Sequence, residues 1–152
     1  MAITAFPTVV DNLIAALRAA PALSGVRVFD GIEIDSSYPG DFIVIGDDGS
    51  EDGEVTAGSG NQSFLELGNL KQFEDASVNC MLASVSGGTS LTARRVRAFQ
   101  LLSAIDTAIR ADVSLGGACM YSTIDTWQPS YRQTDAGAAL IITFTVTYRA
   151  RT

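Results

Sequence analysis

The chain has 152 residues, of which 47% are hydrophobic and 18% charged, and its net charge is −7 at pH 7. These values predict one globular domain, residues 1–152, with an apolar core, and they argue against a disordered chain. The sequence contains no histidine, which removes Ser-His-Asp and Cys-His nucleophile systems and histidine-based zinc sites.

The first third of the chain predicts a helix followed by two short strands. One helical face in residues 7–20 is apolar and carries Val10, Leu13, Ile14 and Leu17. Pro21 prevents this helix from continuing. Short apolar runs at 26–31 and 41–46, each ended by glycine, predict two strands.

The middle of the chain begins with an acidic segment, residues 46–62, that holds five carboxylates, five glycines and no basic residue. This composition predicts a mobile loop at about 46–62, followed by a short strand or arm at 63–68. Residues 74–86 alternate between apolar and mixed side chains, which predicts a strand covered on one face.

The last part of the chain predicts a second helix and two strands. Residues 87–90 form a turn that can cap a helix at about 91–111. The apolar stripe of this helix consists of Ala98, Leu101, Leu102, Ile105, Ala108 and Ile109. Strands are predicted at 120–127 and 139–151, with a polar loop or hairpin tip at 128–137 between them. In the final strand, five large side chains point one way: Leu140, Ile142, Phe144, Val146 and Tyr148.

Each predicted helix has one apolar stripe and each predicted strand one apolar face, so both helices should cover the same face of one sheet. We therefore expect an α+β fold with a mixed, mostly antiparallel sheet and two helices packed on one face. The acidic segment should extend from this sheet as a long loop or arm. The opposite sheet face, rich in Thr, Ser and Asn, should stay polar.

Several further features predict a protein without enzyme activity, cofactor or metal. Lys71, the only lysine, is not part of a phosphate-binding loop, and the dense carboxylates lie in a glycine-rich segment that holds no pair at a fixed separation. Cys80 and Cys119 lack metal-ligand spacing and are expected to be buried thiols in a reducing compartment. No apolar run approaches the ~20 residues of a membrane-spanning helix, and no export signal is evident, so we expect a soluble cytosolic protein.

Charge is distributed unevenly along the chain. Residues 1–75 carry thirteen acidic and three basic residues, whereas residues 76–152 carry four acidic and seven basic residues. Such polarity favours head-to-tail association if folding keeps the two kinds of charge on different surfaces. If folding mixes the two halves, the polarity disappears.

The acidic segment allows two interpretations. Asp48, Ser50, Asp52 and Gly53 match positions one, three, five and six of an EF-hand loop, but Ser59 stands where the bidentate glutamate is required. A calcium site is therefore disfavoured. The alternative is a segment that binds a partner through its five carboxylates, Asp47, Asp48, Glu51, Asp52 and Glu54.

Three arginines at the start of the second predicted helix, Arg94, Arg95 and Arg97, are unusual because the helix dipole disfavours cations there by ~0.3–1 kcal/mol each. They either form a solvated face or contact carboxylates of another subunit. The second interpretation places them in a subunit interface, with the acidic segment as the natural counterpart.

The order of these elements and the character of their sequences resemble those of one protein family. The opening residues 5–31, the strand at 41–46 before a long loop, the helix 91–112 and the final strand 139–151 together resemble the tail terminator, or tail completion, proteins of long-tailed bacteriophages (siphophages). The resemblance spans essentially the whole chain, although no single motif carries it.

The resemblance implies a structural virion protein that forms a ring, typically a hexamer, on the head-proximal end of the tail tube. The ring would stop tube polymerisation and join the tail to the head. The partners of each chain would be other copies of itself, the tail tube protein and a head-neck connector protein. It would assemble in the host cytoplasm and remain at the head-tail junction. An acidic lumen would let DNA pass without specific binding, because it repels phosphates.

Three alternatives stay open at this point. A head-closure or neck connector protein of the same viruses would share the size, the acidity and the lack of catalytic residues. A small-ligand binding module would need a concave apolar pocket. A calcium-dependent adhesion module would need the EF-hand-like ligands to bind the ion.

Overall fold

The computed structural model describes residues 3–31, 40–50, 54–64, 68, 71–86, 88, 90–134 and 137–152. Within them, helices and strands follow in the order α1 (Phe6–Ala19), the 3-10 helix η1 (Pro21–Leu23), β1 (Arg27–Asp30), β2 (Phe42–Ile45), β3 (Gly58–Phe64), β4 (Gln72–Val85), α2 (Leu91–Ala111), β5 (Tyr121–Thr134) and β6 (Gly137–Arg151). This composition confirms the expected α+β class.

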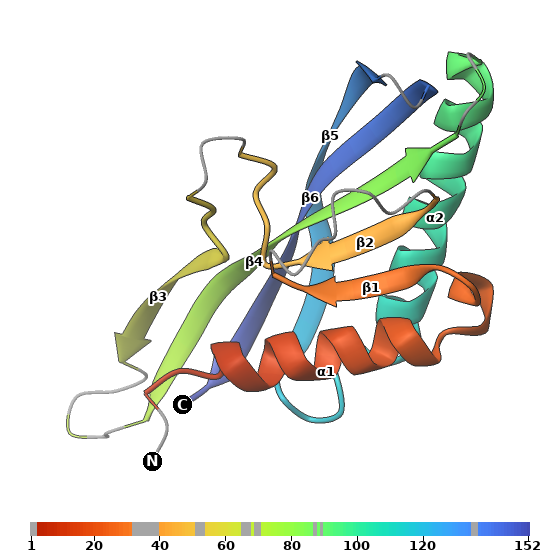
Figure 1. Cartoon of the computed structure of the whole chain (residues 1–152). Coiled ribbons are helices and arrows are strands. Elements are labelled where there is room, and N and C mark those ends of the chain that lie inside the picture. Colours follow the sequence, from red (N-terminus) through yellow and green to blue (C-terminus); the bar gives the residue numbers. More distant parts are fainter. Residues whose placement is uncertain are drawn as a thin grey trace.

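The six described strands form one mixed, mostly antiparallel sheet in the order β1-β2-β4-β6-β5, with β3 also paired to β4 (Figure 1). β1 runs parallel to β2, and the other pairs are antiparallel. One edge of β4 pairs with β6 along residues 73–85. Its other edge pairs with β3 over residues 72–78 and with β2 over residues 80–83.

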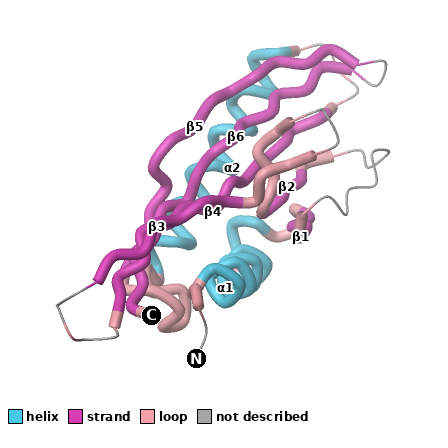
Figure 2. The backbone as a smooth tube through the Cα atoms, turned by 90° about the vertical axis from the view of Figure 1, so that its left-hand side faces the viewer, coloured by secondary structure: helices cyan, strands magenta, loops and turns pink. Residues whose placement is uncertain are grey.

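Both helices cover the same face of this sheet, as expected (Figures 1 and 2). α1 buries one stripe, made of Val9, Leu13, Ile14 and Leu17. Val9 is therefore fully buried where the sequence pattern placed Val10, which is half-buried against the core. Pro7 lies in the first turn of α1, where a missing backbone donor costs nothing.

α2 has the predicted bounds because its start is capped and its stripe is buried. The Ser90 hydroxyl accepts a hydrogen bond from the Ala93 amide at 3.2 Å, which satisfies one of the free amides of the first turn. The buried stripe consists of Ala98, Leu101, Leu102, Ile105 and Ile109. It packs on the five large side chains of β6 named above, all of which are buried. Cys80 and Cys119 are buried and free.

Two predicted boundaries were wrong. The acidic segment does not remain a loop to residue 62, because β3 begins at Gly58 and pairs with β4 over its whole length. A Cβ atom at Gly58 would lie 2.3 Å from the backbone oxygen of Ser77 on β4 and 2.5 Å from Cε2 of Phe6, so the glycine that suggested a loop is needed where β3 passes between β4 and α1. The polar stretch 128–137 is not a loop either: β5 continues to Thr134 and pairs with β6.

β5 contains a β-bulge that sets the direction of its side chains. Ile124 pairs with Val146 and Trp127 with Phe144, so two residues, Asp125 and Thr126, lie opposite the single β6 residue between them. In a regular strand, positions 124 and 127 would face opposite sides of the sheet. The extra residue places both on the helix-covered face.

Candidate functional site

The base of the acidic segment is held against β4 by Asn79. The amides of Gly46 and Asp47 donate to the Asn79 carbonyl oxygen at 2.7 and 3.0 Å, and the Asn79 amide donates to the Ala57 carbonyl oxygen at 2.8 Å. The Asn79 side-chain amide donates to the Thr56 carbonyl oxygen at 2.9 Å. Both ends of the loop therefore meet at one residue of the sheet.

The first two carboxylates of the segment accept local hydrogen bonds. Asp47 is 5% exposed and accepts from the Gly49 amide at 2.7 Å. Asp48 accepts from the amides of Ser50 at 2.9 Å and Thr56 at 3.1 Å. These bonds, the Ser50 bond first, hold the pKa of Asp48 below its usual value because they stabilise the charged carboxylate.

The remaining carboxylates of the predicted partner-binding set differ in position. Glu54 is exposed, whereas Glu51 and Asp52 lie outside the described residues, as does Gly53 of the EF-hand-like pattern. Asp47 is turned inward, so Asp48 and Glu54 are the members that the structure places within reach of a partner. Among the described residues, no three His, Cys, Asp or Glu side chains group to hold a metal ion.

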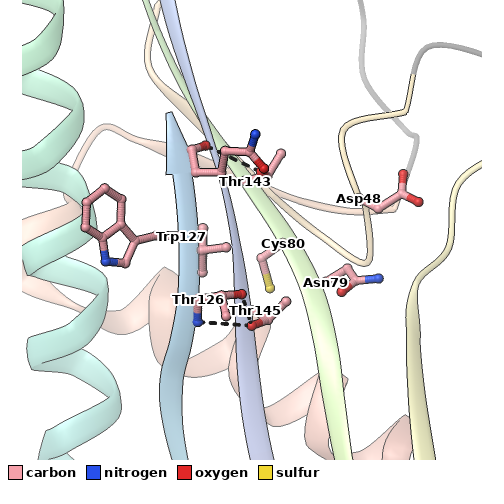
Figure 3. Close-up of a pocket in the computed structure, with 9 residues that line it drawn as sticks. Asp48, Asn79, Cys80, Thr126, Trp127, Thr143 and Thr145 are labelled. Carbon is pink, nitrogen blue, oxygen red and sulfur yellow. Dashed lines mark hydrogen bonds between the residues drawn. The ribbon is translucent and has the colours of Figure 1, made fainter. Parts of the chain in front are cut away.

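The loop base covers part of the sheet face opposite the helices. Gly49 has a φ of +79°, and a Cβ atom there would lie 2.6 Å from Cγ2 of Thr143 on β6, so only glycine allows this approach. A cavity of about 270 Å³ remains between the loop base and strands β5 and β6. Figure 3 shows Asp48 and Asn79 on one side of it.

The other side of this cavity carries Thr126 and Thr145, whose hydroxyls lie 2.7 Å apart (Figure 3). Cys80 also lines it, but burial raises the pKa of its thiol to about 12, so the thiol stays protonated and unreactive near neutral pH. The lining therefore offers hydroxyl, amide and carboxylate groups suited to hydrogen bonding.

Two of the three predicted interface arginines belong to a network within the chain. Arg97 Nε donates to Asp41 Oδ2 at 2.8 Å, and the Ser84 hydroxyl donates to Asp41 Oδ1 at 2.8 Å. Arg94 Nη1 donates to the Ser84 hydroxyl at 2.9 Å. The network joins α2 to β4 and to the residue before β2. Its hydrogen bonds and its carboxylate offset the unfavourable interaction of the two arginines with the helix dipole.

Arg95 lies apart from this network. Its Nη1 donates to the Tyr131 hydroxyl at 2.9 Å, and both residues are exposed. The structure thus links Arg97 to Asp41 directly and Arg94 to it through Ser84, and it leaves Arg95 on the surface beside β5. A contact between these arginines and another subunit stays a prediction, and Arg95 is the member best placed for it.

A buried carboxylate, Glu74, joins three elements at the other end of the molecule. Glu74 is 2% exposed. Its Oε1 accepts from the Tyr148 hydroxyl at 2.6 Å and the Ala5 amide at 3.2 Å, and its Oε2 accepts from Gln62 Nε2 at 3.1 Å. Burial acts to raise the pKa of Glu74, but the hydrogen bonds it accepts, those from Thr4 and Tyr148 foremost, together lower it.

Sequence reasoning missed this Glu74 clamp, although one signal was present. Glu74 has the same parity along β4 as the buried Val78, Cys80 and Leu82, and a charged residue on a buried face needs hydrogen-bond partners. The exposed Tyr131 was missed because the strand was predicted to end at 127, and the direction of Trp127 was missed because the bulge before it has no signal in the sequence pattern.

In the half of the sheet that contains β3, the four strands β3, β4, β6 and β5 lie side by side, and the two outer strands each have an open edge. Ser59, Ser77, Thr147 and Thr123 follow one another in register across β3, β4, β6 and β5. No other described strand pairs with the outer edge of β3 or of β5. A four-stranded segment therefore ends in a free strand on either side.

No protein-family model matches this chain, and no curated protein matches it. Neither helix in the described part of the chain has the combination of length and apolar character that a membrane crossing requires.

Proposed function

We propose that this chain is a tail terminator protein of a long-tailed bacteriophage. It caps the head-proximal end of the tail tube as a ring, stops tube polymerisation and joins the tail to the head through a neck connector protein. The resemblance of the whole sequence to that family suggests the role, and the ring number, six, comes from that resemblance alone.

The observation that carries the proposal is the pair of open sheet edges. A ring needs two different surfaces that fit head to tail, because identical surfaces close a dimer instead. β3 and residues 121–124 of β5 are two different open edges at opposite sides of one four-stranded segment, in the same register, which supports their use as the two surfaces. Pairing β3 of one copy with β5 of the next would continue the sheet from subunit to subunit.

The sequence of β3 favours this use. Native edge strands are usually protected against pairing by charged residues, proline or bulges. β3 has none of these: its sequence is GSGNQSF, and six of its seven residues are exposed. Phe64 at its end is 69% exposed, so an apolar contact would add to the backbone hydrogen bonds.

The test is a phage in which this reading frame is deleted, supplied with wild-type or variant protein. Wild-type protein should restore tails of uniform length with a ring at the head-proximal end, seen by electron microscopy. Ser59→Lys and Thr123→Lys, at the two open edges, should abolish the ring and give overlong tubes. Ser130→Lys is the matched control, because it lies beside Pro129, where β5 is already unsuited to pairing.

Uniform tails without this chain would overturn the proposal. Rings formed equally well by Ser59→Lys and Thr123→Lys would overturn the contact between edges. Both substituted side chains are exposed, so the variants should fold like the wild type. Circular dichroism and thermal unfolding measure whether they do.

A second measurement tests the acidic segment as a tail-docking element. Changing Glu51, Asp52 and Glu54 to the corresponding amides removes charge without touching the bonds at Asn79. Attachment to tails should fall while rings still form. A deletion within the acidic segment is a less specific test, because one that reaches residue 58 would also remove part of β3.

A further inference from the structure

A groove of about 390 Å³ lies between the C-terminal half of α2 and β5. Its apolar lining includes Leu102 of α2 and Ile124 of β5. Two carboxylates, Asp106 and Asp125, and the indole of Trp127 provide the remaining chemistry. The groove shares Trp127 with the cavity at the loop base and has no lining residue in β3.

The β-bulge of β5 creates this arrangement. Because Asp125 and Thr126 share one partner position on β6, Trp127 faces α2. The indole packs edge-to-face on Phe99 of α2, with ring centres 5.6 Å apart and planes at 90°. Trp127 nevertheless remains 56% exposed, and Figure 3 shows it pointing toward α2, away from the cavity at the loop base.

The charge of the groove is not balanced within the chain. Asp106 Oδ2 accepts from Arg110 Nε at 2.7 Å. No described residue donates to the Asp125 carboxylate. Two carboxylates and one arginine therefore leave the groove with a net negative charge next to a fixed aromatic ring.

We propose that this groove docks a basic side chain, arginine above all, presented by a segment of a different protein. A guanidinium stacks on an indole face and donates its N–H groups to a carboxylate. Trp127 and Asp125 offer these two partners in one groove, and its volume suits one long side chain. The apolar Leu102 and Ile124 would contact the methylene stem of that side chain.

The net charge of the chain favours a different protein over a second copy. At −7, with an isoelectric point near 4.3, two copies repel one another at long range, whereas a basic partner is attracted. β3, the strand proposed above to join copies, has no basic residue that would enter the groove. The inference depends on the groove alone and holds whether or not the chain is a tail terminator.

Trp127 is the only tryptophan of the chain, so its fluorescence reports directly on the groove. The probe is the peptide acetyl-Gly-Gly-Arg-Gly-Gly-amide, titrated at constant ionic strength, and its control is the same peptide with neutral citrulline in place of arginine. We expect a saturable change in emission with the arginine peptide and binding about fivefold weaker or more with the citrulline peptide.

Matched variants locate the binding. Asp125→Asn should weaken binding of the arginine peptide about fivefold, and Asp106→Asn should weaken it less, because Arg110 already neutralises that carboxylate. Asp30→Asn removes the same charge from an exposed residue of β1, at the opposite edge of the sheet from β5, and should leave binding unchanged.

Three results would overturn the inference: no saturable emission change, an equal change with the citrulline peptide, or an equal loss of binding in Asp30→Asn. A fourth would change the occupant. If emission shifts with protein concentration alone, sedimentation shows self-association, and Asp125→Asn removes both, the groove binds a second copy and not a different protein.

Discussion

Of the strands at the two sides of the sheet, β5 is protected in its middle against pairing with another strand and β3 is not. β3 has seven residues, without charge, proline or bulge. β5 has fourteen residues, and its middle carries both a bulge at Asp125–Thr126 and Pro129. Proline and bulges interrupt backbone pairing, so the upper part of β5 can recognise a partner only through its side chains, whereas β3 can do so through its backbone.

The difference extends to how each strand is held in place. β3 has little apolar contact of its own, and it is held by its backbone pairing with β4 and by Gln62, which donates to the buried Glu74. β5 is held through the packing of Trp127 on Phe99 and of Ile124 against the core. Polar contacts to Glu74 support the β3 side, and aromatic packing supports the β5 side. Substitutions at the two sides should therefore change the free energy of unfolding by different amounts and with a different dependence on pH.

The largest effect is expected for Glu74→Ala at the β3 side. The substitution leaves the Tyr148 hydroxyl and the Ala5 amide without their acceptor in a buried site. Loss of a buried, multiply bonded carboxylate costs about 3 kcal/mol. Urea unfolding measures the free energy of unfolding, and Asp75→Ala is the matched control.

Asp75 is the next residue along β4, exposed, and paired with Arg149 at 2.6 Å. Because solvent screens this pair, its removal should have a much smaller effect. Equal losses for Glu74→Ala and Asp75→Ala would show that the clamp does not hold the β3 side.

A smaller loss is expected for Trp127→Ala at the β5 side. It removes the edge-to-face contact with Phe99 and the buried half of the indole, which together are worth about 1–2 kcal/mol. Trp127→Phe should recover most of this loss because it keeps an aromatic ring against Phe99. Urea unfolding followed by circular dichroism is the measurement, and a phenylalanine variant as unstable as the alanine variant would contradict the packing role.

The smallest expected effect is a change of stability with pH, which should occur at the β3 side and not at the β5 side. The folded pKa of Glu74 lies below its ordinary value of about 4.5, so the ionised carboxylate stabilises the fold above that pH. This contribution is lost as pH falls through the folded pKa. The stability difference between wild type and Glu74→Gln should therefore shrink below about pH 4.5, whereas the difference between wild type and Trp127→Phe should stay constant. Parallel profiles for all three proteins would refute a role for Glu74 ionisation.

Elements with strong local signals were predicted well. α2 was placed at 91–111 because a turn with a capping serine precedes it and its apolar stripe is continuous. β6 was placed within two residues at its start because five large apolar side chains alternate without interruption. In both cases the signal lies within the element itself and does not depend on its neighbours.

Elements that depend on distant partners were not predicted. Apart from Phe64, β3 consists of glycine and polar residues, and it is a strand because β4 supplies its hydrogen bonds and leaves room only for glycine at position 58. The extension of β5 past Pro129 follows from its pairing with β6. Asp41 is 56 residues away from Arg97 in the sequence. The sequence pattern therefore indicated that the arginines are unusually placed at a helix start, but it could not identify the carboxylate that pairs with them.

The anchoring of residues 46, 47, 56 and 57 on Asn79 has a consequence for variation and engineering. Since the side chain and backbone of Asn79 hold both ends of the acidic segment, we expect that changing the length or sequence of residues 51–53 costs little free energy of folding: doubling the length of a connection costs only about 0.6 kcal/mol. A peptide tag could therefore be inserted in this stretch while the sheet beneath it is preserved.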